Sequence, residues 1–427
     1  MSLNTQPYKG ARDFYPEDKR LQKYIFGKLR SCVESFGYHE YDAPILESFD
    51  IYAAKTGEEI VNEQLYSFED KGGRKLAIRP EMTPSVSRMV AARRQELAYP
   101  LRWYSIPNLW RYERPQRGRL REHWQLNVDL FGIEGVEADA EIIQVADALL
   151  KNFGAKASDY VIRINSRKLV NFLLDEHLEL PPDDAKALTK LIDRRSKMEA
   201  GDFSKALTDQ IGAERAELAA SLFDVPKVEN LPALFKEQDS VRNLKKLFGL
   251  LVKAGVKNAV FDLSIMRGFD YYTDVVFEVF DTNPENNRSM FGGGRYDGMV
   301  GLFGVDPVPT VGFGMGDVTL QNFLEAHSLL PKLPPETESI AVLIGDVYDE
   351  AQKVLDQIRA AGINLAVDFS ERKLDAQIKS AVKSGAKYVL FIGEHELSSG
   401  KFKLRELAQS HEQILELSDV ISALSSN

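Results

Sequence analysis

The chain of 427 residues is long enough for about three domains. Its 54 basic and 64 acidic residues give a formal net charge of −10, which excludes a protein that coats nucleic acid non-specifically. One cysteine excludes an intrachain disulfide, and the sequence has neither a signal-peptide core nor an apolar run of about 18 residues, so we expect a cytoplasmic protein without membrane spans.

The first third of the chain predicts short strands and helices around one long hairpin. An apolar stripe predicts a helix over 17–37. A short strand over 75–80 ends at a proline, and a helix over 82–99 follows it. Residues 101–114 and 123–132 are predicted to be the two strands of the hairpin. The loop between them has about eight residues, and loops of this length are often functional.

The middle of the chain changes from sheet-forming to helical sequence and back. A helix is predicted over 137–153 and a strand over 161–165. Residues 167–250 are charged and mostly helical in pattern, which is typical of an insertion into a larger sheet domain. Strand-rich sequence returns at 258–281, and a glycine-rich segment follows at 289–304.

The C-terminal part begins after a proline-rich linker at 331–337. Beyond the linker, predicted strands alternate with helices over 349–361 and 372–384. This alternation predicts an α/β domain with a mostly parallel sheet over 338–427.

A concentration of arginine marks the loop of the predicted hairpin. Five arginines and two glutamates between residues 111 and 123 give it a local net charge of +3 in an acidic chain. The planar guanidinium group suits phosphate oxygens, and strand positions hold it more rigidly than a tail would. The loop therefore indicates a nucleotide or RNA phosphate site, and a solvated loop with surface ion pairs is the alternative.

Other segments carry candidate binding residues. RPEMT at 79–83 offers a glutamate and a threonine to an ammonium group, or only the N-cap of a helix. RGFDYYT at 267–273 offers an arginine and two tyrosines, or only aromatic core packing. Glycines within 292–298 and 312–316 allow a ligand close to the backbone, or form turns. The sequence contains no dinucleotide fingerprint, P-loop, HExxH zinc site or GxSxG elbow.

In their order along the chain, these segments resemble the histidyl-tRNA synthetases, a family of class II aminoacyl-tRNA synthetases. The shared order is far more specific than any one segment. The matching segments are YDAPILE at 41–47, RPEMT at 79–83, RYERPQRGRLREHWQLNVDLFG at 111–132, RGFDYYTDVVFEV at 267–279, GGGRYDGM at 292–299 and VGFGMG at 311–316.

The resemblance implies a fold class and a domain organisation. Residues 1–330 would form an α+β catalytic core, a class II synthetase antiparallel sheet with helices, with a helical insertion at about 167–250. Residues 338–427 would form a C-terminal α/β domain of the anticodon-binding type. The resemblance also implies a homodimer with Pro44 near its interface.

The family activates L-histidine with ATP to histidyl-adenylate and transfers the histidyl group to tRNA-His. The resemblance therefore implies a histidine-tRNA ligase. Arg111 and Arg267 match the catalytic arginines that act on the α-phosphate of ATP. Arg111, Glu113 and Arg121 match the ATP contacts. Mg²⁺ would bridge the β- and γ-phosphates, and Glu113 is its one candidate protein ligand.

The histidine pocket follows from the same matching. Asp129 and Tyr272 match the pair that binds the two imidazole nitrogens, and a substrate without both nitrogens would leave buried polar groups unpaired. Arg114 and Gln116 match positions that reach the acceptor stem of the tRNA, including its extra 5′ guanosine. The residues matched to histidine binding are Glu81, Thr83, Arg111, Gln125, Asp129, Arg267, Tyr271, Tyr272 and Tyr296.

The sequence departs from the family at the third motif. Thr319 stands where the family usually has an arginine that stacks on adenine, and this loss would weaken ATP binding by about 1 kcal/mol or more. Asp129 is one methylene shorter than the family's common glutamate. The alternative is a non-catalytic histidine sensor, similar to the regulatory subunit of ATP phosphoribosyltransferase. Such regulators typically lack the C-terminal domain and the histidine-pocket residues, which favours the enzyme.

Overall fold

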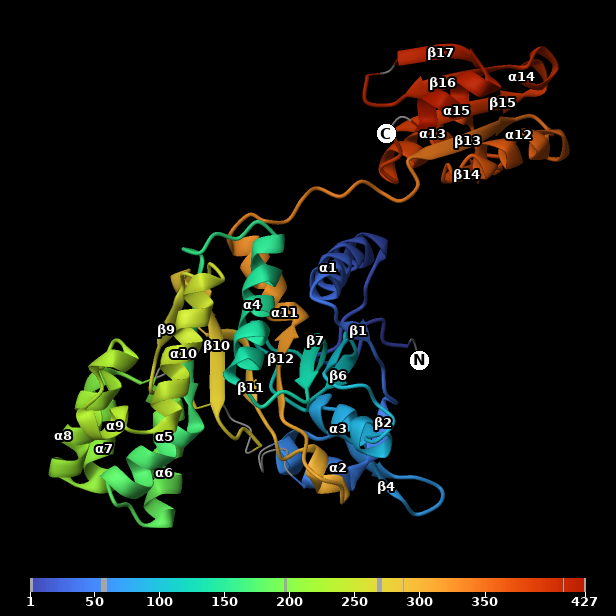
Figure 1. Cartoon of the computed structure of the whole chain (residues 1–427). Helices are drawn as coiled ribbons and strands as arrows, with labels where there is room; N and C mark the ends of the chain where they lie inside the picture. The colour runs from blue at the N-terminus through green and yellow to red at the C-terminus, as the bar shows by residue number, and fades with distance from the viewer. Residues whose placement is uncertain are drawn as a thin grey trace. The chain divides into compact units, whose positions relative to one another are not determined.

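The structure is a computed structural model that describes residues 3–54, 60–195, 198–266, 271–286, 288–409 and 411–425. The chain divides into two compact units (Figure 1). One unit contains Met1–Asp13 and Tyr24–Leu330, and the other contains Phe14–Lys23 and Pro331–Asn427. Within the described residues, no helix is both long and apolar enough to cross a membrane.

The first unit is built on a mainly antiparallel sheet with the strand order β1-β5-β7-β12-β11-β10-β8-β9, and β6 pairs with β7 beside this path. Among the described pairs, β1–β5 and β8–β9 are parallel. The strands are β1 (His39–Glu40), β5 (Leu101–Ser105), β6 (Asn108–Trp110), β7 (Glu122–Phe131), β8 (Tyr160–Ser166), β9 (Ala259–Phe261), β10 (Val275–Asp281), β11 (Ser289–Arg295) and β12 (Thr310–Gly316). The predicted α+β core with an antiparallel sheet is therefore confirmed.

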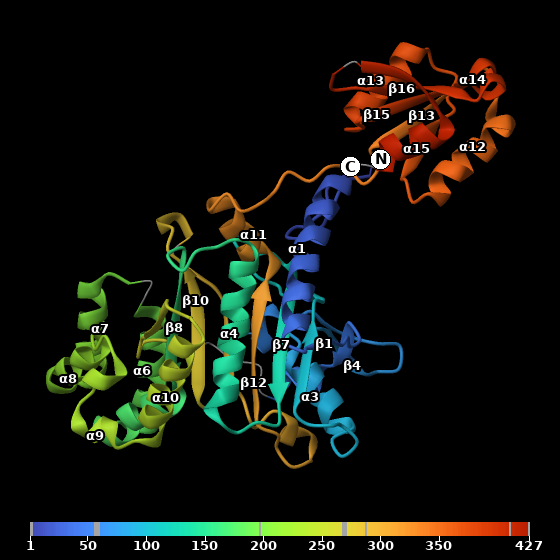
Figure 2. The ribbon, with the colours of Figure 1, turned by 45° about the horizontal axis from the view of Figure 1, so that its top comes forward.

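Strand β7 has two different faces because successive side chains of a strand point in opposite directions. Leu126, Val128 and Leu130 share one face, and Gln125 and Asp129 share the other. Helix α4 (Val136–Asn152) packs on the apolar face, and Figures 1 and 2 show it running along the sheet beside β7 and β12. The opposite, polar face is left to form a site.

A second, smaller sheet has the strand order β2-β4-β3, and helix α2 packs against β2, β4 and helix α3. It supports the RPEMT segment, which follows its central strand directly. The elements of the first unit outside the large sheet and the insertion are α1 (Pro16–Ser35, which also reaches into the second unit), β2 (Leu46–Ser48), α2 (Phe49–Ala53), η1 (Ile60–Gln64), β3 (Ser67–Glu69), β4 (Lys75–Ile78), α3 (Thr83–Ala92), α4, η5 (Pro284–Asn286), η6 (Val300–Phe303) and α11 (Asp317–Ala326).

Between β8 and β9 the described residues form helices and loops. Figure 1 shows these helices gathered beside the sheet, with α10 packed against α4. They are α5 (Arg167–Asn171), η2 (Phe172–His177), α6 (Pro182–Arg194), α7 (Ala200–Ile211), α8 (Ala213–Phe223), η4 (Val228–Asn230), α9 (Ala233–Lys236) and α10 (Asp239–Lys253).

The C-terminal part of the second unit is an α/β domain. Its sheet has the order β14-β13-β15-β16-β17, in which β13 pairs in parallel with β14 and β15, and the last two strands are antiparallel. Its elements are β13 (Ser339–Ile344), α12 (Tyr348–Ala360), β14 (Leu365–Asp368), α13 (Leu374–Lys383), β15 (Tyr388–Gly393), α14 (Glu394–Ser399), β16 (Lys401–Glu406), β17 (His411–Glu416) and α15 (Leu417–Ser425). The α/β class predicted for this part is confirmed, but the predicted mostly parallel sheet is wrong, because two of the four described pairings are antiparallel.

Two local predictions were wrong. The helix predicted over 82–99 ends at Ala92, and turns follow it. The strand predicted over 101–114 is interrupted after Ser105, because Pro107 has no N–H to donate to a ladder, and it resumes only for Asn108–Trp110.

Candidate active site

One cavity of the first unit collects residues from five separated segments of the sequence. Its volume is about 40 Å³, and because a single water needs roughly 10–15 Å³, it admits a group of a few heavy atoms. It contains eight of the nine residues that the sequence predicts to bind histidine. Among the described residues, its lining is Glu81, Thr83, Arg111, Gln125, Asn127, Asp129, Tyr271, Tyr272, Tyr296, Gly312, Phe313 and Gly314.

The ninth predicted histidine-binding residue, Arg267, lies outside the described residues. Its predicted role as the second catalytic arginine, and its convergence with Arg111 on one phosphate, therefore stay predictions.

The floor of the cavity is formed where β7 and β12 pair. Gly312 lies opposite Asp129, and Gly314 lies opposite Asn127. A methyl group added to Gly312 would lie 2.6 Å from the carbonyl oxygen of Val128 and 2.9 Å from the hydroxyl of Tyr296. The glycines expected to form turns or to lie near a ligand therefore sit inside a strand, where the absent side chains leave space for the polar groups of β7.

Replacing Gly312 by alanine is expected to destabilise the protein by about 1–3 kcal/mol and to remove histidine binding, because the backbone of β7 cannot move away from the new methyl group. Thermal unfolding and equilibrium dialysis with labelled histidine measure the two effects. Gly298→Ala is the control, since a methyl group there meets no atom within 4 Å. Wild-type histidine affinity in Gly312→Ala would show that the floor is not closely packed.

Asp129 is a buried acid in this cavity, with only 4% of its surface exposed. Its Oδ1 accepts a hydrogen bond from the hydroxyl of Tyr296, and its Oδ2 has no hydrogen-bond partner of normal geometry among the described residues. Burial raises the pKa of Asp129 to about 7, and interactions with Tyr296 and Tyr41 oppose that rise. The carboxyl group therefore exchanges its proton near neutral pH, and Oδ2 can accept a hydrogen bond from an N–H group of a ligand.

Three tyrosines form an aromatic wall beside Asp129. The ring centroid of Tyr271 lies 4.9 Å from that of Tyr272 and 5.6 Å from that of Tyr296. The Tyr271 hydroxyl donates a hydrogen bond of 3.0 Å to Oε2 of Glu81, which is 3% exposed. A planar ring can therefore pack against apolar faces while carboxylates meet its polar edge.

Glu81 and Thr83 are held by an anchored backbone. Arg79, only 5% exposed, donates to the carbonyl oxygen of Ala43 at 2.6 Å and to that of Asn108 at 3.1 Å. Helix α3 begins at Thr83 itself, and its N-cap is Met82 with no side-chain capping bond. The alternative interpretation of Thr83 as an N-cap is therefore wrong.

Arg111 joins the cavity to the arginine-rich loop. Its Nε donates to the carbonyl oxygen of Pro80 at 2.9 Å, and its Nη1 lies 3.9 Å from Oε1 of Glu113. Nearby, burial together with the charges of Arg111 and Arg12 lowers the pKa of His123 to about 3. This end of the cavity therefore has guanidinium groups around a neutral imidazole, which suits an anionic ligand.

The remaining predicted ligand contacts lie on the loop and do not line the cavity. Glu113 forms an ion pair with Arg119 at 3.3 Å. Arg121 stacks on the ring of Tyr112, 3.9 Å from its centroid, and donates to the hydroxyl of Tyr8 at 2.7 Å. The N-terminal segment therefore covers the side chain that the sequence assigns to ATP.

Arg114 and Gln116, the predicted acceptor-stem contacts, are exposed on the same loop. The backbone groups of Gln116 and Arg119 exchange hydrogen bonds of 3.0 and 2.9 Å, which close the tip of the loop. Exposed arginines on a closed hairpin are accessible to a large polyanion.

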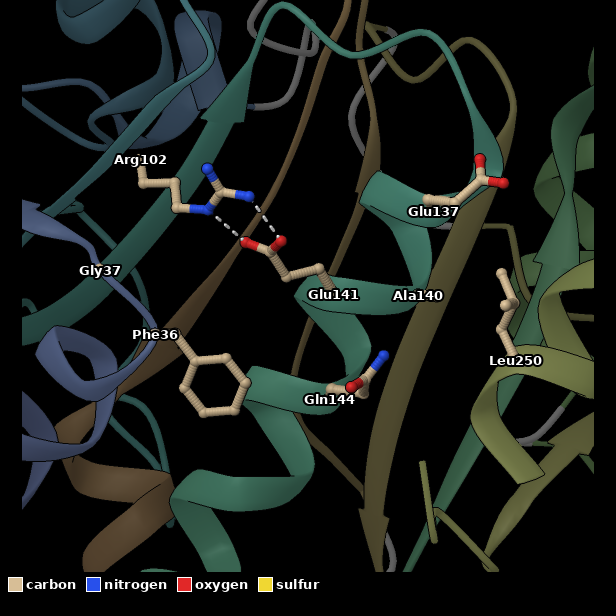
Figure 3. Close-up of a pocket in the computed structure, with 8 residues that line it drawn as sticks. All are labelled: Phe36, Gly37, Arg102, Glu137, Ala140, Glu141, Gln144 and Leu250. Carbon is tan, nitrogen blue, oxygen red and sulfur yellow. Dashed lines mark hydrogen bonds and ion pairs between the residues drawn. The ribbon is translucent and has the colours of Figure 1, made fainter. Parts of the chain in front are cut away.

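A larger hollow of about 500 Å³ lies on the opposite face of the sheet, between the end of α1, α4 and α10 (Figure 3). Figure 3 shows the side chains of Arg102 and Glu141 joined at the wall of this hollow, where their ion pair is 2.7 Å long. Glu137 is likewise paired with Lys246. Its charged walls neutralise one another, and it contains no residue predicted to bind a ligand.

Comparisons with known proteins agree with this site. A model of the histidyl-tRNA synthetase family matches residues 10–318, and an anticodon-binding domain model matches residues 339–427. The chain belongs to the histidyl-tRNA synthetase family. It is 41% identical to a histidine–tRNA ligase of Leptospira biflexa over 428 residues, which cover 99% of this chain and 98% of the relative.

Two further relatives of the histidyl-tRNA synthetase family show how widely the similarity extends. A histidine–tRNA ligase of Thermoplasma volcanium is 36% identical, with 99% of both chains covered. The crystal structure of histidyl-tRNA synthetase from Nostoc sp. PCC 7120 superposes with a TM-score of 0.83 at 23% identity, again with 99% of both chains covered. The fold is therefore that of the family over the whole chain.

In this member of the histidyl-tRNA synthetase family, Thr319 occupies the first turn of α11. Its hydroxyl donates to the carbonyl oxygen of Met290 at 2.8 Å, so the side chain binds the sheet. Two residues earlier, Asp317 forms an ion pair of 2.6 Å with Arg12 of the N-terminal segment. Thr319 therefore has a structural role at the position where the resemblance led us to expect an arginine.

Two residues near Asp129 were not predicted from the sequence: Asn127, which lines the cavity, and Tyr41, which interacts with Asp129. The alternation of β7 places Asn127 between Gln125 and Asp129 on the same face, so the period of the strand contained that signal. Tyr41 reaches Asp129 from the far side of β5, and no local pattern in the sequence indicates this approach.

Proposed function

We propose that this member of the histidyl-tRNA synthetase family is a histidine-tRNA ligase, which forms histidyl-adenylate from L-histidine and ATP and transfers the histidyl group to tRNA-His. The observation that carries the proposal is the cavity that Glu81, Asp129 and Arg111 line together. Acids at two positions and a guanidinium at a third suit an amino acid with a basic ring and a reacting carboxylate.

Each end of histidine has partners of matching chemistry. The carboxylates of Glu81 and Asp129 are acceptors for the α-ammonium group and for an imidazole N–H, respectively. Thr83 and Gln125 offer further polar contacts near the ammonium group. Tyr272 is the proposed partner of the second ring nitrogen, and Tyr271 and Tyr296 enclose the ring.

The reaction itself brings two anions together, since the histidine carboxylate attacks the α-phosphate of ATP. The barrier falls when a fixed cation stabilises the charge that develops on the phosphate oxygens. Arg111 is the proposed cation, because its bond to the carbonyl oxygen of Pro80 keeps its guanidinium beside the cavity. Arg267 is proposed as the second cation on sequence resemblance alone.

ATP is the proposed second substrate, with Glu113 and Arg121 as contacts, and Mg²⁺ enters with its phosphates. Among the described residues there is no group of three acidic, histidine or cysteine side chains that would hold a metal ion unaided. Glu113, a single carboxylate on the loop, fits a metal that takes most of its oxygens from phosphates and water. Bound Mg²⁺ would neutralise charge on the leaving pyrophosphate.

Partners of the enzyme follow from its exposed surfaces. Arg114 and Gln116 are the proposed acceptor-stem contacts, and residues 338–427 are proposed to bind the anticodon. Ile45 and Leu46, more than 40% exposed beside Pro44, support a homodimer at this segment.

Histidine-dependent exchange of labelled pyrophosphate into ATP tests the function. The expected result is exchange that requires histidine and Mg²⁺, followed by charging of a tRNA-His transcript. Folded protein that binds histidine but shows no exchange at saturating substrates would overturn the proposal and support a histidine sensor. If the protein catalyses pyrophosphate exchange but does not charge tRNA-His, then its contacts with the tRNA, and not the activation step, are defective.

A further inference from the structure

Beside Asp129, which binds the imidazole ring in the function proposed above, lie two buried hydroxyls that histidine binding does not use, those of Tyr41 and Ser105. Oδ2 of Asp129, the hydroxyl of Tyr41 and the hydroxyl of Ser105 are all buried, and within the part of the chain that the structure describes none of them has a hydrogen-bond partner of normal geometry. The three groups nevertheless interact with one another, Tyr41 with both Ser105 and Asp129. A buried polar atom without a well-formed hydrogen bond costs folding free energy. Three such atoms side by side therefore indicate a functional role for this arrangement.

These atoms reach the same place from three different elements. Asp129 is on β7 and Ser105 is on the neighbouring β5, whereas Tyr41 follows β1. The Tyr41 backbone N–H donates to the carbonyl oxygen of Tyr104 at 2.8 Å, and its ring packs at 5.8 Å against that of Trp103. These contacts fix the ring, so that its hydroxyl is held behind the carboxyl group of Asp129.

We propose that Tyr41 is a positioning residue for histidine recognition, whose hydroxyl acts with that of Tyr296 to keep Asp129 ionised and aimed at an imidazole N–H. Asp129 then has a phenol donor on each side, and it presents its remaining lone pairs to the substrate. This inference rests on the proposed function, because it assigns Asp129 to the imidazole ring.

The protonation of Asp129 makes the inference testable. Burial alone favours the neutral acid, which is a weaker acceptor than the carboxylate, and the two phenols favour the carboxylate. The titratable and charged groups around it are Tyr296 after β11, Tyr41 and Tyr38 around β1, and Tyr271, Tyr272, Glu81 and Arg111 across the cavity. On β5, Arg102 lies on the opposite face of the strand and pairs with Glu141, and Arg79 and Asp42 are the charged groups near Tyr41.

Tyr41→Phe removes one oxygen atom and leaves the ring that packs on Trp103. We expect the KM for histidine in ATP–pyrophosphate exchange to rise by about tenfold or more, with kcat changed less than about twofold. Asp129 loses a donor that stabilises its ionised form, so the pH below which histidine affinity falls should move upward. The titration of free histidine is the same for both proteins, so the difference between their pH profiles reports the enzyme.

Tyr160→Phe is the matched control, because its buried hydroxyl donates to the carboxylate of Asp147 at 2.6 Å, away from the cavity. It should leave the pH profile unchanged. Histidine binding in the absence of ATP, measured by calorimetry against pH, repeats the test without catalysis. Two results would overturn the inference. One is a folded Tyr41→Phe protein with an unchanged KM and an unchanged pH profile. The other is an equal fall in kcat and kcat/KM with an unchanged pH profile.

The wild-type reaction separates this inference from the proposed function. If wild-type protein shows no histidine-dependent exchange, the proposed function fails. If the wild type is active and Tyr41→Phe behaves like it, only the role of Tyr41 fails. A Ser105→Ala protein, which loses the second buried hydroxyl, should show a smaller shift in the same direction.

Discussion

Arg111→Ala should reduce histidine-dependent ATP–pyrophosphate exchange by about 10²–10³-fold, the usual loss when one fixed group that stabilises transition-state charge is removed. The guanidinium lies beside the cavity and is held by the carbonyl oxygen of Pro80, so a water that replaced it would need to reorganise during the reaction. Exchange at saturating histidine and ATP measures the effect on kcat. Histidine binding without ATP should weaken far less, since Glu81 and Asp129 remain.

Two further variants make this result specific. Arg119→Ala removes a cation from the same loop, but one whose side chain is 57% exposed and pairs with Glu113. It should leave exchange within a few fold of wild type. Arg111→Lys keeps the charge and loses the planar fork, so it should recover only part of the activity. Wild-type exchange in folded Arg111→Ala would contradict the assignment of the phosphate site.

Asp129→Asn should raise the stability of the ligand-free protein above pH 7 and remove most of its histidine affinity. In the unfolded chain an aspartate titrates near pH 3.9, whereas burial raises the pKa of Asp129 to about 7. The folded protein therefore keeps a proton that the unfolded chain loses, and stability falls as pH rises from about 4 to 7. The difference of about three pKa units corresponds to at most about 4 kcal/mol, reached above pH 7.

The neutral amide has no such cost, so the midpoint of thermal unfolding should increase at pH 8 and stay near the wild-type value at pH 4. Histidine binding at pH 8 should weaken by at least about tenfold, because a hydrogen bond to a charged acceptor is lost. An Asn variant that is less stable than wild type at pH 8 would show that the carboxylate has a partner that compensates for its burial.

Local patterns of the sequence predicted most elements because their physical causes are local. The alternation of β7 and the apolar stripe of α4 require only neighbouring residues, and both elements lie within one or two residues of the prediction. The helix after RPEMT was predicted too long, since nothing near Ala92 in the sequence stops it. From the sequence, the glycines of β11 and β12 could also be interpreted as turns. Their actual role depends on the neighbouring strands, whose atoms leave no room for a Cβ atom at most of these positions.

The sequence by itself determined which chemical groups the site contains, because its acids, tyrosines and arginines occur in segments of a fixed order. That order also indicated the family and the candidate site residues. Only the tertiary structure decided that Asp129 is buried with a phenol on two sides, that Tyr8 covers Arg121, and that Thr319 binds the sheet. The physical reason is that burial and partners depend on strand pairing between residues far apart in the chain. The sequence of one segment does not indicate how deeply a distant segment will bury its side chains.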